Sequence, residues 1–503
     1  MEKMRINNLR SLKDTDEINI KKMNILVGNN SSGKSTFLRI FPLLKQTFNN
    51  KVNGPILWCG DDDDYVDFGS FNEAVNYSAT EKCINLEFEF KIDIHNDRFS
   101  FGVQKKQNKK ENVKVLFSIK SGKSGREYIA LYKYKLRQYT LEVYFSEQNQ
   151  IVDLYLDGEK IELDTSTERY FSYFYYSQSV FDVSLDSIGR SAYEHLSNLL
   201  NILDSEKNLP GTFERRIEQI YNNKILNEKT DKDIKLERFC DKKNVEKVLQ
   251  WVLLYNFAAQ YRSISSYLRT YFLSIYYIAP IRATAERYYR LRNIAVKEVD
   301  CRGKNLPIFL NSLSERSFKQ FQNFTKTNLG FEVEKKSNGG HVSLEIKKNG
   351  QPKAINLSDT GFGYSQILPI VTQVWYIQEE AKRRKDMRNM PFDDGECDIP
   401  LTVVIEQPEL HLHPGLQAKL IDVMINVIQE GNINFIIETH SDTMINRIGD
   451  LISKKKMKKD DVNIIIFEKK DSDDNTVVTQ GGYDEEGYLL PGWPVGFFEP
   501  EED

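Results

Sequence analysis

A glycine-rich segment near the start of the sequence has the residue types and spacing of a phosphate-binding loop. Gly28 and Gly33 are separated by four polar residues, and Lys34 and Ser35 follow directly. The segment lies between the apolar run 23–27 and the helix-like apolar run 37–44, which is the context that a P-loop requires. Glycines let backbone N–H groups approach phosphate oxygens, and the helix N-terminus favours an anion. We therefore predict that a nucleoside triphosphate binds here, with Lys34 on its β- and γ-phosphates and Ser35 on Mg²⁺. The residues assigned to the loop are Gly28, Asn29, Asn30, Ser31, Ser32, Gly33, Lys34, Ser35 and Thr36.

Two further apolar runs end in residues suited to phosphate chemistry. Residues 401–405 lead into Glu406, Gln407 and Glu409, and residues 434–437 lead to His440. Parallel strands present their carboxyl ends at one edge of a sheet, so these side chains are expected to meet. A carboxylate there can hold the metal, and a neutral imidazole can contact the γ-phosphate. We predict Glu406 as a magnesium ligand and His440 as a catalytic residue at the γ-phosphate.

A second candidate anion site precedes the apolar run 367–374. Ser358, Gly361 and Gly363 are closely spaced before this predicted helix. A serine and glycines at a helix N-terminus can bind an anion through the hydroxyl and the backbone N–H groups.

The elements that position these residues are predicted to lie at both ends of the chain. Residues 1–50 and the stretch from 357 onward alternate strand and helix, which is typical of an α/β sheet. Between them, short alternating runs rich in Val, Ile, Tyr and Phe predict an antiparallel sheet, and residues 165–300 favour helices. We predict an N-terminal part of one α/β domain over 1–80, a β-rich segment over 81–165, a helical insertion over 166–300 and the rest of the α/β domain over 301–503.

Composition excludes several other classes of protein. The 503 residues carry a formal net charge of −4, which gives no electrostatic support for a nucleic-acid-binding protein. Five scattered cysteines without CxxC spacing exclude a zinc ribbon and argue against a disulfide scaffold. No signal-peptide core is present, and the longest apolar stretch is too short for a membrane helix. We expect a cytoplasmic protein that contacts no membrane.

The order of these motifs resembles the ABC-type ATPase head of the SMC, RecF and OLD groups. More narrowly, residues 404–414, 361–369 and 492–498 resemble OLD-like bacterial ATPases, some of which act in antiphage defence in the Septu and PARIS systems and with retrons. The segment 277–282 also resembles one common in that group. The resemblance covers about residues 1–50 and 277–498; the insertion between them resembles nothing informative.

The resemblance implies ATP and Mg²⁺ as cofactors and an assembly of at least two chains. In ABC-type heads, the signature loop of one subunit closes over ATP held by the P-loop of another. Each chain has one of each, so we expect an ATP-dependent homodimer or higher homo-oligomer. Ser358, Gly361 and Gly363 would be the signature residues acting in trans, and which of them makes the key contact stays open.

One departure from the family pattern bears on hydrolysis. Gln407 stands where a glutamate usually serves as general base, and an amide can orient water but cannot accept its proton. Either Glu409 supplies the base, or hydrolysis is slow and ATP mainly holds a conformational state. His413 stands where many relatives have an aspartate.

The resemblance also implies a role through partners. About sixty residues follow His440, which is too few for the Toprim nuclease domain of full OLD nucleases, and no other nuclease-like cluster is apparent. We expect a slow ATPase that serves as sensor and regulatory scaffold of a bacterial antiphage system and controls a separate effector, a nuclease. The alternatives are a RecF-like DNA clamp that uses basic runs such as 454–459, with steep salt dependence, and a nucleotide-gated scaffold without turnover. A transporter ATPase fits poorly.

Overall fold

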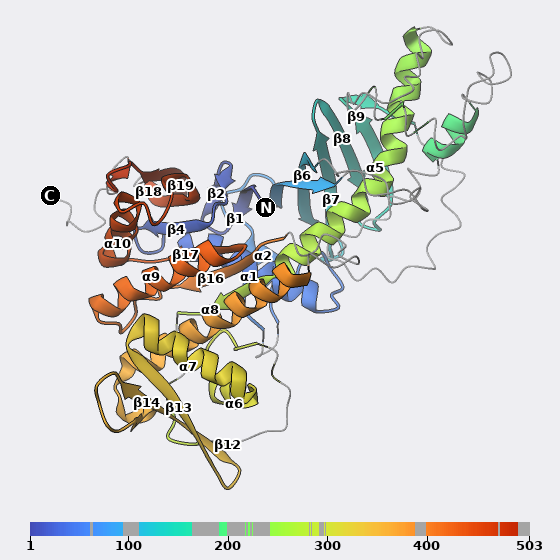
Figure 1. Ribbon diagram of the computed structural model, residues 1–503. Coiled ribbons are helices and arrows are strands. Elements are labelled where there is room, and N and C mark those ends of the chain that lie inside the picture. The colour runs from blue at the N-terminus through green and yellow to red at the C-terminus, as the bar shows by residue number, and fades with distance from the viewer. Residues whose placement is uncertain are drawn as a thin grey trace. The chain divides into compact units, whose positions relative to one another are not determined.

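The computed structural model describes most of the chain in two compact units (Figure 1). The described residues are 1–60, 64–93, 110–162, 191–198, 217, 220, 221, 224, 242–280, 282, 284–290, 296, 298–387, 399–470 and 473–490. One unit comprises Glu2–Asn50, Ile56–Ile84 and Thr270–Asp503, and the other comprises Met1, Lys51–Pro55 and Asn85–Arg269. We call the first unit the head and the second the inserted unit.

The head is built on a seven-stranded sheet. Its order is β11 (Ile275–Ile278), β16 (Leu401–Glu406), β17 (Ile433–Glu438), β4 (Met23–Gly28), β18 (Val462–Lys470), β19 (Asp473–Tyr483) and β20 (Leu489–Leu490). The first five strands are parallel, and the last two pairings are antiparallel. Every residue of β4 and β16 is buried, which explains why these strands read as continuous apolar runs rather than alternating ones.

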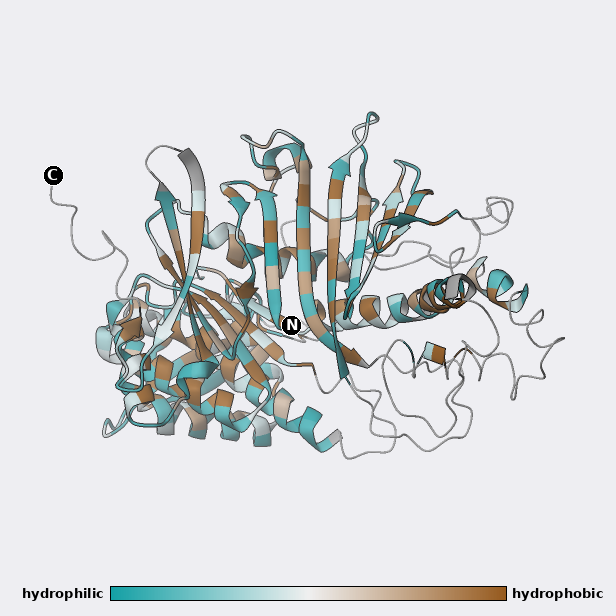
Figure 2. Ribbon diagram, turned by 90° about the horizontal axis from the view of Figure 1, so that it is seen from above, coloured by the Kyte–Doolittle hydropathy of each residue, from teal (hydrophilic) through white to brown (hydrophobic). Residues whose placement is uncertain are grey.

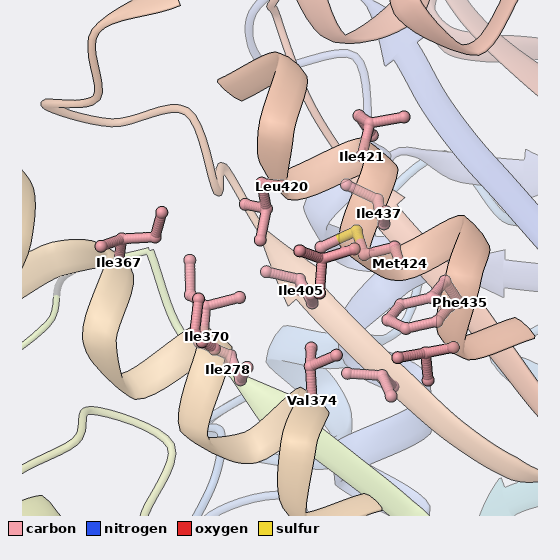
Figure 3. Packing of buried hydrophobic residues seen from close by; sticks show 14 of the residues in the cluster. Ile278, Ile367, Ile370, Val374, Ile405, Leu420, Ile421, Met424, Phe435 and Ile437 are labelled. Carbon is pink, nitrogen blue, oxygen red and sulfur yellow. The ribbon is translucent and has the colours of Figure 1, made fainter. Parts of the chain in front are cut away.

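Helices cover both faces of this sheet. The helix α1 (Lys34–Asn49) packs on one face, against β4, β11, β16 and β17. The helices α8 (Phe362–Met387) and α9 (Pro414–Glu430) pack on β16 and β17, and α10 (Asp442–Ser453) packs on α9. Figure 3 shows side chains of α8 and α9 packed on Ile405, Phe435 and Ile437 of the sheet. Successive strand residues point to opposite faces of a sheet. Glu406 follows Ile405 and Glu438 follows Ile437, so both glutamates point to the opposite face, which α1 covers.

Smaller elements complete the head. The strands β1 (Lys3–Leu9), β2 (Leu12–Asp14) and β3 (Ile18–Asn19) pair antiparallel, and β12 (Tyr289–Arg290), β13 (Phe331–Asn338), β14 (His341–Lys348) and β15 (Ile355–Asn356) form a further sheet. Short or flanking helices are α2 (Phe71–Ala74), α6 (Leu306–Ser312), α7 (Glu315–Leu329), and the 3₁₀ turns η5 (Leu357–Asp359) and η7 (Lys459–Asp461).

The inserted unit carries the antiparallel sheet that the sequence predicts. Its strands follow chain order: β5 (Cys83–Asp93), β6 (Lys110–Ser121), β7 (Glu127–Leu136), β8 (Tyr139–Phe145), β9 (Ile151–Leu156) and β10 (Glu159–Lys160). The long helix α5 (Lys242–Leu273) packs aromatic residues on this sheet, with Phe257 and Tyr261 against the fully buried Tyr132. Brown and teal bands alternate along these strands in Figure 2, the pattern of a sheet with one buried face.

The prediction of an α/β domain assembled from both ends of the chain, with a β-rich and helical segment between them, is confirmed. The head resumes at Thr270 rather than at the predicted residue 301, because β11 joins the parallel sheet. The inserted unit begins at Asn85 rather than at 81 and also includes Met1 and Lys51–Pro55. Residues 271–281 form one apolar stretch, so periodicity could not separate the end of α5 from the buried strand β11. Much of the predicted helical insertion and the motif 492–498 lie outside the described residues.

Candidate nucleotide-binding site

The predicted P-loop connects the central strand β4 to α1. Gly28 ends the strand with φ +139°, and a β-carbon there would lie 2.0 Å from the carbonyl oxygen of Phe467 on β18. Gly33 caps α1 with φ +92°, and its β-carbon would lie 2.8 Å from Ser11 Oγ. Only glycine fits such conformations without strain. The spacing of the two glycines therefore reflects the close packing of the loop between its neighbours.

Lys34 lies folded into the loop. Its Nζ donates to the carbonyl oxygens of Gly28 at 2.9 Å and Asn29 at 2.6 Å, and the residue is 3% exposed. Burial lowers the pKa of the Lys34 ammonium, and the charge of Glu438 opposes that change. The ammonium group of Lys34 is thus held inside the loop, and it could contact a bound phosphate without a large movement of the side chain.

The loop opens onto a pocket of about 370 Å³. Residues from distant segments line it, namely Ser11, Asn30, Ser31, Ser32, Gly33, Lys34, Ser35, Thr36, Gln407, Glu438 and His440. The fold therefore brings the P-loop, Gln407 and His440 to one site. Glu406 and Glu409 are not among the lining residues.

Glu406 lies at the end of β16 and is 2% exposed. Its Oε1 and Oε2 accept from Arg39 Nε and Nη2 of α1, each at 2.8 Å, and Oε1 also accepts from the Tyr277 hydroxyl at 2.6 Å. The bidentate pair raises the pKa of Arg39 far above its ordinary value. In the structure, the carboxylate predicted to bind magnesium is thus engaged by three donors.

Glu438, at the end of β17, is the pocket residue that the sequence analysis missed. Its Oε1 accepts from Ser35 Oγ at 2.8 Å, and the buried Oε2 has no hydrogen-bond partner. Burial, and next the charge of Glu406, raise the pKa of Glu438 to about 7. The available signal was the acid itself: the apolar strand before His440 ends in a carboxylate, as the strand before Gln407 does.

Gln407 is held in an uncommon backbone conformation at the pocket wall. Its φ is +43°, and its N–H donates to the carbonyl oxygen of Glu438 at 2.8 Å. The buried Arg282 donates to the carbonyl oxygen of Glu406 at 3.0 Å. Burial lowers the pKa of Arg282 to about 10. Non-glycine residues with positive φ persist where surrounding contacts enforce them, often at functional sites.

Glu409 and His440 are joined by a hydrogen bond. The backbone N–H of His440 donates to Glu409 Oε1 at 2.7 Å, and Glu409 Oε2 is buried without a partner. Burial raises the pKa of Glu409. Burial, with the nearby charge of Lys34, lowers the pKa of His440. The imidazole of His440 is therefore neutral at pH 7, and its remaining ring N–H can still donate a hydrogen bond.

The predicted signature residues lie elsewhere in the head. Ser358, in η5, donates its hydroxyl to Asn356 Oδ1 at 2.8 Å and is exposed, as is Gly361 with φ +79°. Gly363 lies at the start of α8, where an added β-carbon would meet the His411 carbonyl oxygen at 3.3 Å. None of the three lines the pocket at the P-loop of its own chain.

Two further findings concern metal sites and membranes. Within the described residues, no group of three or more His, Cys, Asp or Glu side chains is arranged to hold a metal. Among the helices that the structure describes, none combines the length and the apolar character needed to cross a membrane. His413, noted for its place in the family pattern, caps α9: its Nδ1 accepts from the Gly415 N–H at 3.1 Å.

Comparison with known proteins identifies the family. Residues 1–445 match the family model described as AAA ATPase domain. A search of curated proteins found no match. Similar solved structures include the Smc head domain of Pyrococcus furiosus with an extended coiled coil, bound to the C-terminal domain of ScpA, at 12% identity and a TM-score of 0.33 over 95% of both chains. Another is the SMC head domain of Thermotoga maritima, at 10% identity and a TM-score of 0.32, covering 95% of this chain and 97% of that one.

The family match extends over most of the chain, so the protein belongs to the AAA ATPase domain family. The coarser part of the sequence-based prediction, a P-loop ATPase, is thereby confirmed.

Proposed function

We propose that this protein binds ATP with Mg²⁺ in the pocket at the P-loop and hydrolyses it slowly. The observation that carries the proposal is the convergence of Lys34, Ser35, Gln407, Glu438 and His440 on that one pocket. Lys34 would meet the β- and γ-phosphates, and His440, neutral at pH 7, would donate to the γ-phosphate. Bound Mg²⁺ would neutralise charge that develops on the phosphate oxygens.

We propose slow turnover because an amide, Gln407, stands in this pocket at the position where the family pattern has a glutamate as general base. Gln407 lines it, but its amide can only orient the attacking water. Glu409, the candidate replacement, uses one carboxylate oxygen for the backbone of His440 and is not a lining residue. Glu409 supports the architecture of the site in this proposal, and its service as a general base is the alternative.

We further propose that the active form is a homodimer or higher homo-oligomer with composite sites. Ser358 and Gly361 are exposed just before α8 begins, away from the pocket of their own chain. Phe362 beside them is 64% exposed, which is unusual for a large apolar residue. These residues are thus available to meet ATP bound to a second chain.

The biological role proposed here is that of a sensor and regulatory subunit of a bacterial antiphage system, acting on a separate effector such as a nuclease. The support is the resemblance of residues 361–369 and 404–414 to OLD-like ATPases. A RecF-like clamp on DNA is the second candidate. In the run 454–459, Lys454 pairs with Asp450 and Lys459 with Glu485, which reduces the positive charge offered to a phosphate backbone.

The test is magnesium-dependent phosphate release by the wild type, Lys34→Ala and Glu409→Gln. Slow release that Lys34→Ala abolishes and Glu409→Gln preserves supports the proposal. If Glu409→Gln stops turnover while ATP still binds, Glu409 is the base. Release unaffected by Lys34→Ala would refute a role for the P-loop. Sedimentation with and without ATP tests assembly, and duplex-DNA binding at increasing salt tests the clamp.

A further inference from the structure

Two buried glutamates lie side by side at the edge of the sheet. Glu406 of β16 is in register with Glu438 of β17, and both strands are parallel neighbours. Registered residues on adjacent strands point to the same face, here the face covered by α1. Glu406 is 2% exposed and Glu438 is 3% exposed. Two adjacent buried carboxylates repel each other unless cations compensate them.

The helix α1 treats the two acids differently. Ser35 and Arg39 are one helical turn apart and so lie on the same side of α1. Arg39 contacts Glu406 with two hydrogen bonds of 2.8 Å, whereas Ser35 offers Glu438 only its hydroxyl, also at 2.8 Å. Glu406 thus has its compensating cation within the protein. Among the described residues, none forms an ion pair with Glu438, and Lys34 and Arg39 act on it only as nearby charges.

The second oxygen of Glu438 is available to a ligand. Its Oε2 is buried and has no hydrogen-bond partner, and the side chain lines the pocket together with Ser35. A buried carboxylate oxygen left without a donor is costly. A cation that enters with the nucleotide would remove that cost.

We propose that Glu438, together with Ser35, holds the Mg²⁺ of the bound nucleotide, and that Glu406 is a positioning residue that fixes α1 through Arg39. The inference rests on the proposed function, since it concerns the metal of that same site. Mg²⁺ prefers oxygen ligands and is commonly bound by one or two carboxylates together with substrate phosphates. A serine hydroxyl and one carboxylate, without a larger cluster of protein ligands, fit that pattern.

The experiment measures the affinity of a fluorescent, slowly hydrolysed ATP analogue in EDTA and in MgCl₂. For the wild type, Mg²⁺ should increase the affinity. Glu438→Gln should retain the affinity in EDTA and lose at least about tenfold of the gain from Mg²⁺. The matched variant Glu406→Gln, also buried and at the corresponding strand end, should retain the gain. Mn²⁺ binding in the presence of ADP, followed by electron paramagnetic resonance, should weaken in Glu438→Gln only.

Thermal unfolding of each variant shows whether it has folded. If Glu438→Gln does not fold, Glu438→Asp and Glu406→Asp repeat the comparison. Shortening the side chain by one methylene should reduce the Mg²⁺-dependent increase in nucleotide affinity in Glu438→Asp but not in Glu406→Asp. The assignment is overturned if the position-438 variant keeps this increase or if the position-406 variant loses it. Failure of the proposed function looks different: Lys34→Ala would then leave affinity in EDTA unchanged, and Mg²⁺ would have no effect on the wild type.

Discussion

The ion pair between Arg39 and Glu406 provides the sharpest test of the structure. The change is Arg39→Met, which keeps a long apolar side chain and removes the guanidinium. Glu406 would then remain buried with the Tyr277 hydroxyl as its donor in place of three. Breaking a buried pair by removal of one partner costs about 3–5 kcal/mol. The Arg39 side chain is 35% exposed, so solvent screens part of the interaction. We therefore expect Arg39→Met to destabilise the head by about 2–4 kcal/mol.

A double-mutant cycle separates the pair from its surroundings. Glu406→Gln leaves Arg39 able to reach water and should cost about 1–2 kcal/mol. The double variant should cost less than the sum of the single ones, by about 1–3 kcal/mol, because the buried uncompensated charge is gone. The exposed pair of Lys22 with Asp461 supplies the control: Lys22→Met should cost at most about 1 kcal/mol.

The assay is hydrogen–deuterium exchange of peptides from β4, β16 and β17. This measurement reports on the head directly, whereas global unfolding of a chain with two compact units need not follow one transition. Unchanged exchange in Arg39→Met, or strictly additive effects in the cycle, would refute the ion pair. Glu406 would then be free to bind metal, as the sequence alone predicts.

Three further predictions concern the loop, pH and catalysis. Gly28→Ala should destabilise the head by about 3 kcal/mol or more, because its β-carbon would overlap the Phe467 carbonyl oxygen. Gly361→Ala has open space around the added β-carbon but a positive φ, so it should cost about 1 kcal/mol. Thermal unfolding compares the two variants. Since the native pKa of Glu438 is raised to about 7, its contribution to nucleotide-free stability is full below the unfolded value of 4.5 and is lost as pH rises toward 7. Glu438→Gln should therefore gain stability relative to wild type between pH 5 and 8, by up to about 3 kcal/mol in urea titrations, and a constant difference would contradict this. His440→Ala should slow phosphate release about a hundredfold with ATP affinity retained, and unchanged turnover would remove His440 from the mechanism.

The sequence predicts those parts of the site that depend on local spacing. The P-loop glycines are recognisable because each meets a local demand, Gly28 at the strand end and Gly33 at the helix start. The ends of β16 and β17 are recognisable because buried strands are largely apolar runs: every residue of β16 is buried, as is every residue of β17 except Asn434. The antiparallel sheet of the inserted unit is likewise predictable, because apolar and polar residues alternate along its strands.

The partners of each side chain could not be predicted in this way. The choice of Ser35 for Glu438 and of Arg39 for Glu406 depends on the register of β16 with β17 and on the rotation of α1 above them. Both are tertiary quantities without a local signal. For the same reason, the sequence gives no indication that Glu409 binds the backbone of His440. An acidic residue at the end of a strand can be identified from the sequence, but the residue that donates a hydrogen bond to it cannot.

The position of β4 in the sheet has a consequence for synthesis of the protein. Both hydrogen-bonded neighbours of β4, β17 and β18, come from residues beyond 432, so the strand that carries the P-loop emerges from the ribosome long before either partner. At about 5–20 residues per second, this wait lasts roughly 20–80 seconds. During that time the apolar residues of β4 and α1 have no partner strands to pack with. The inserted unit, which lies in the chain between α1 and β17, is already being translated. Newly made chains should therefore depend on chaperones that shield the N-terminal segment until the last strand arrives.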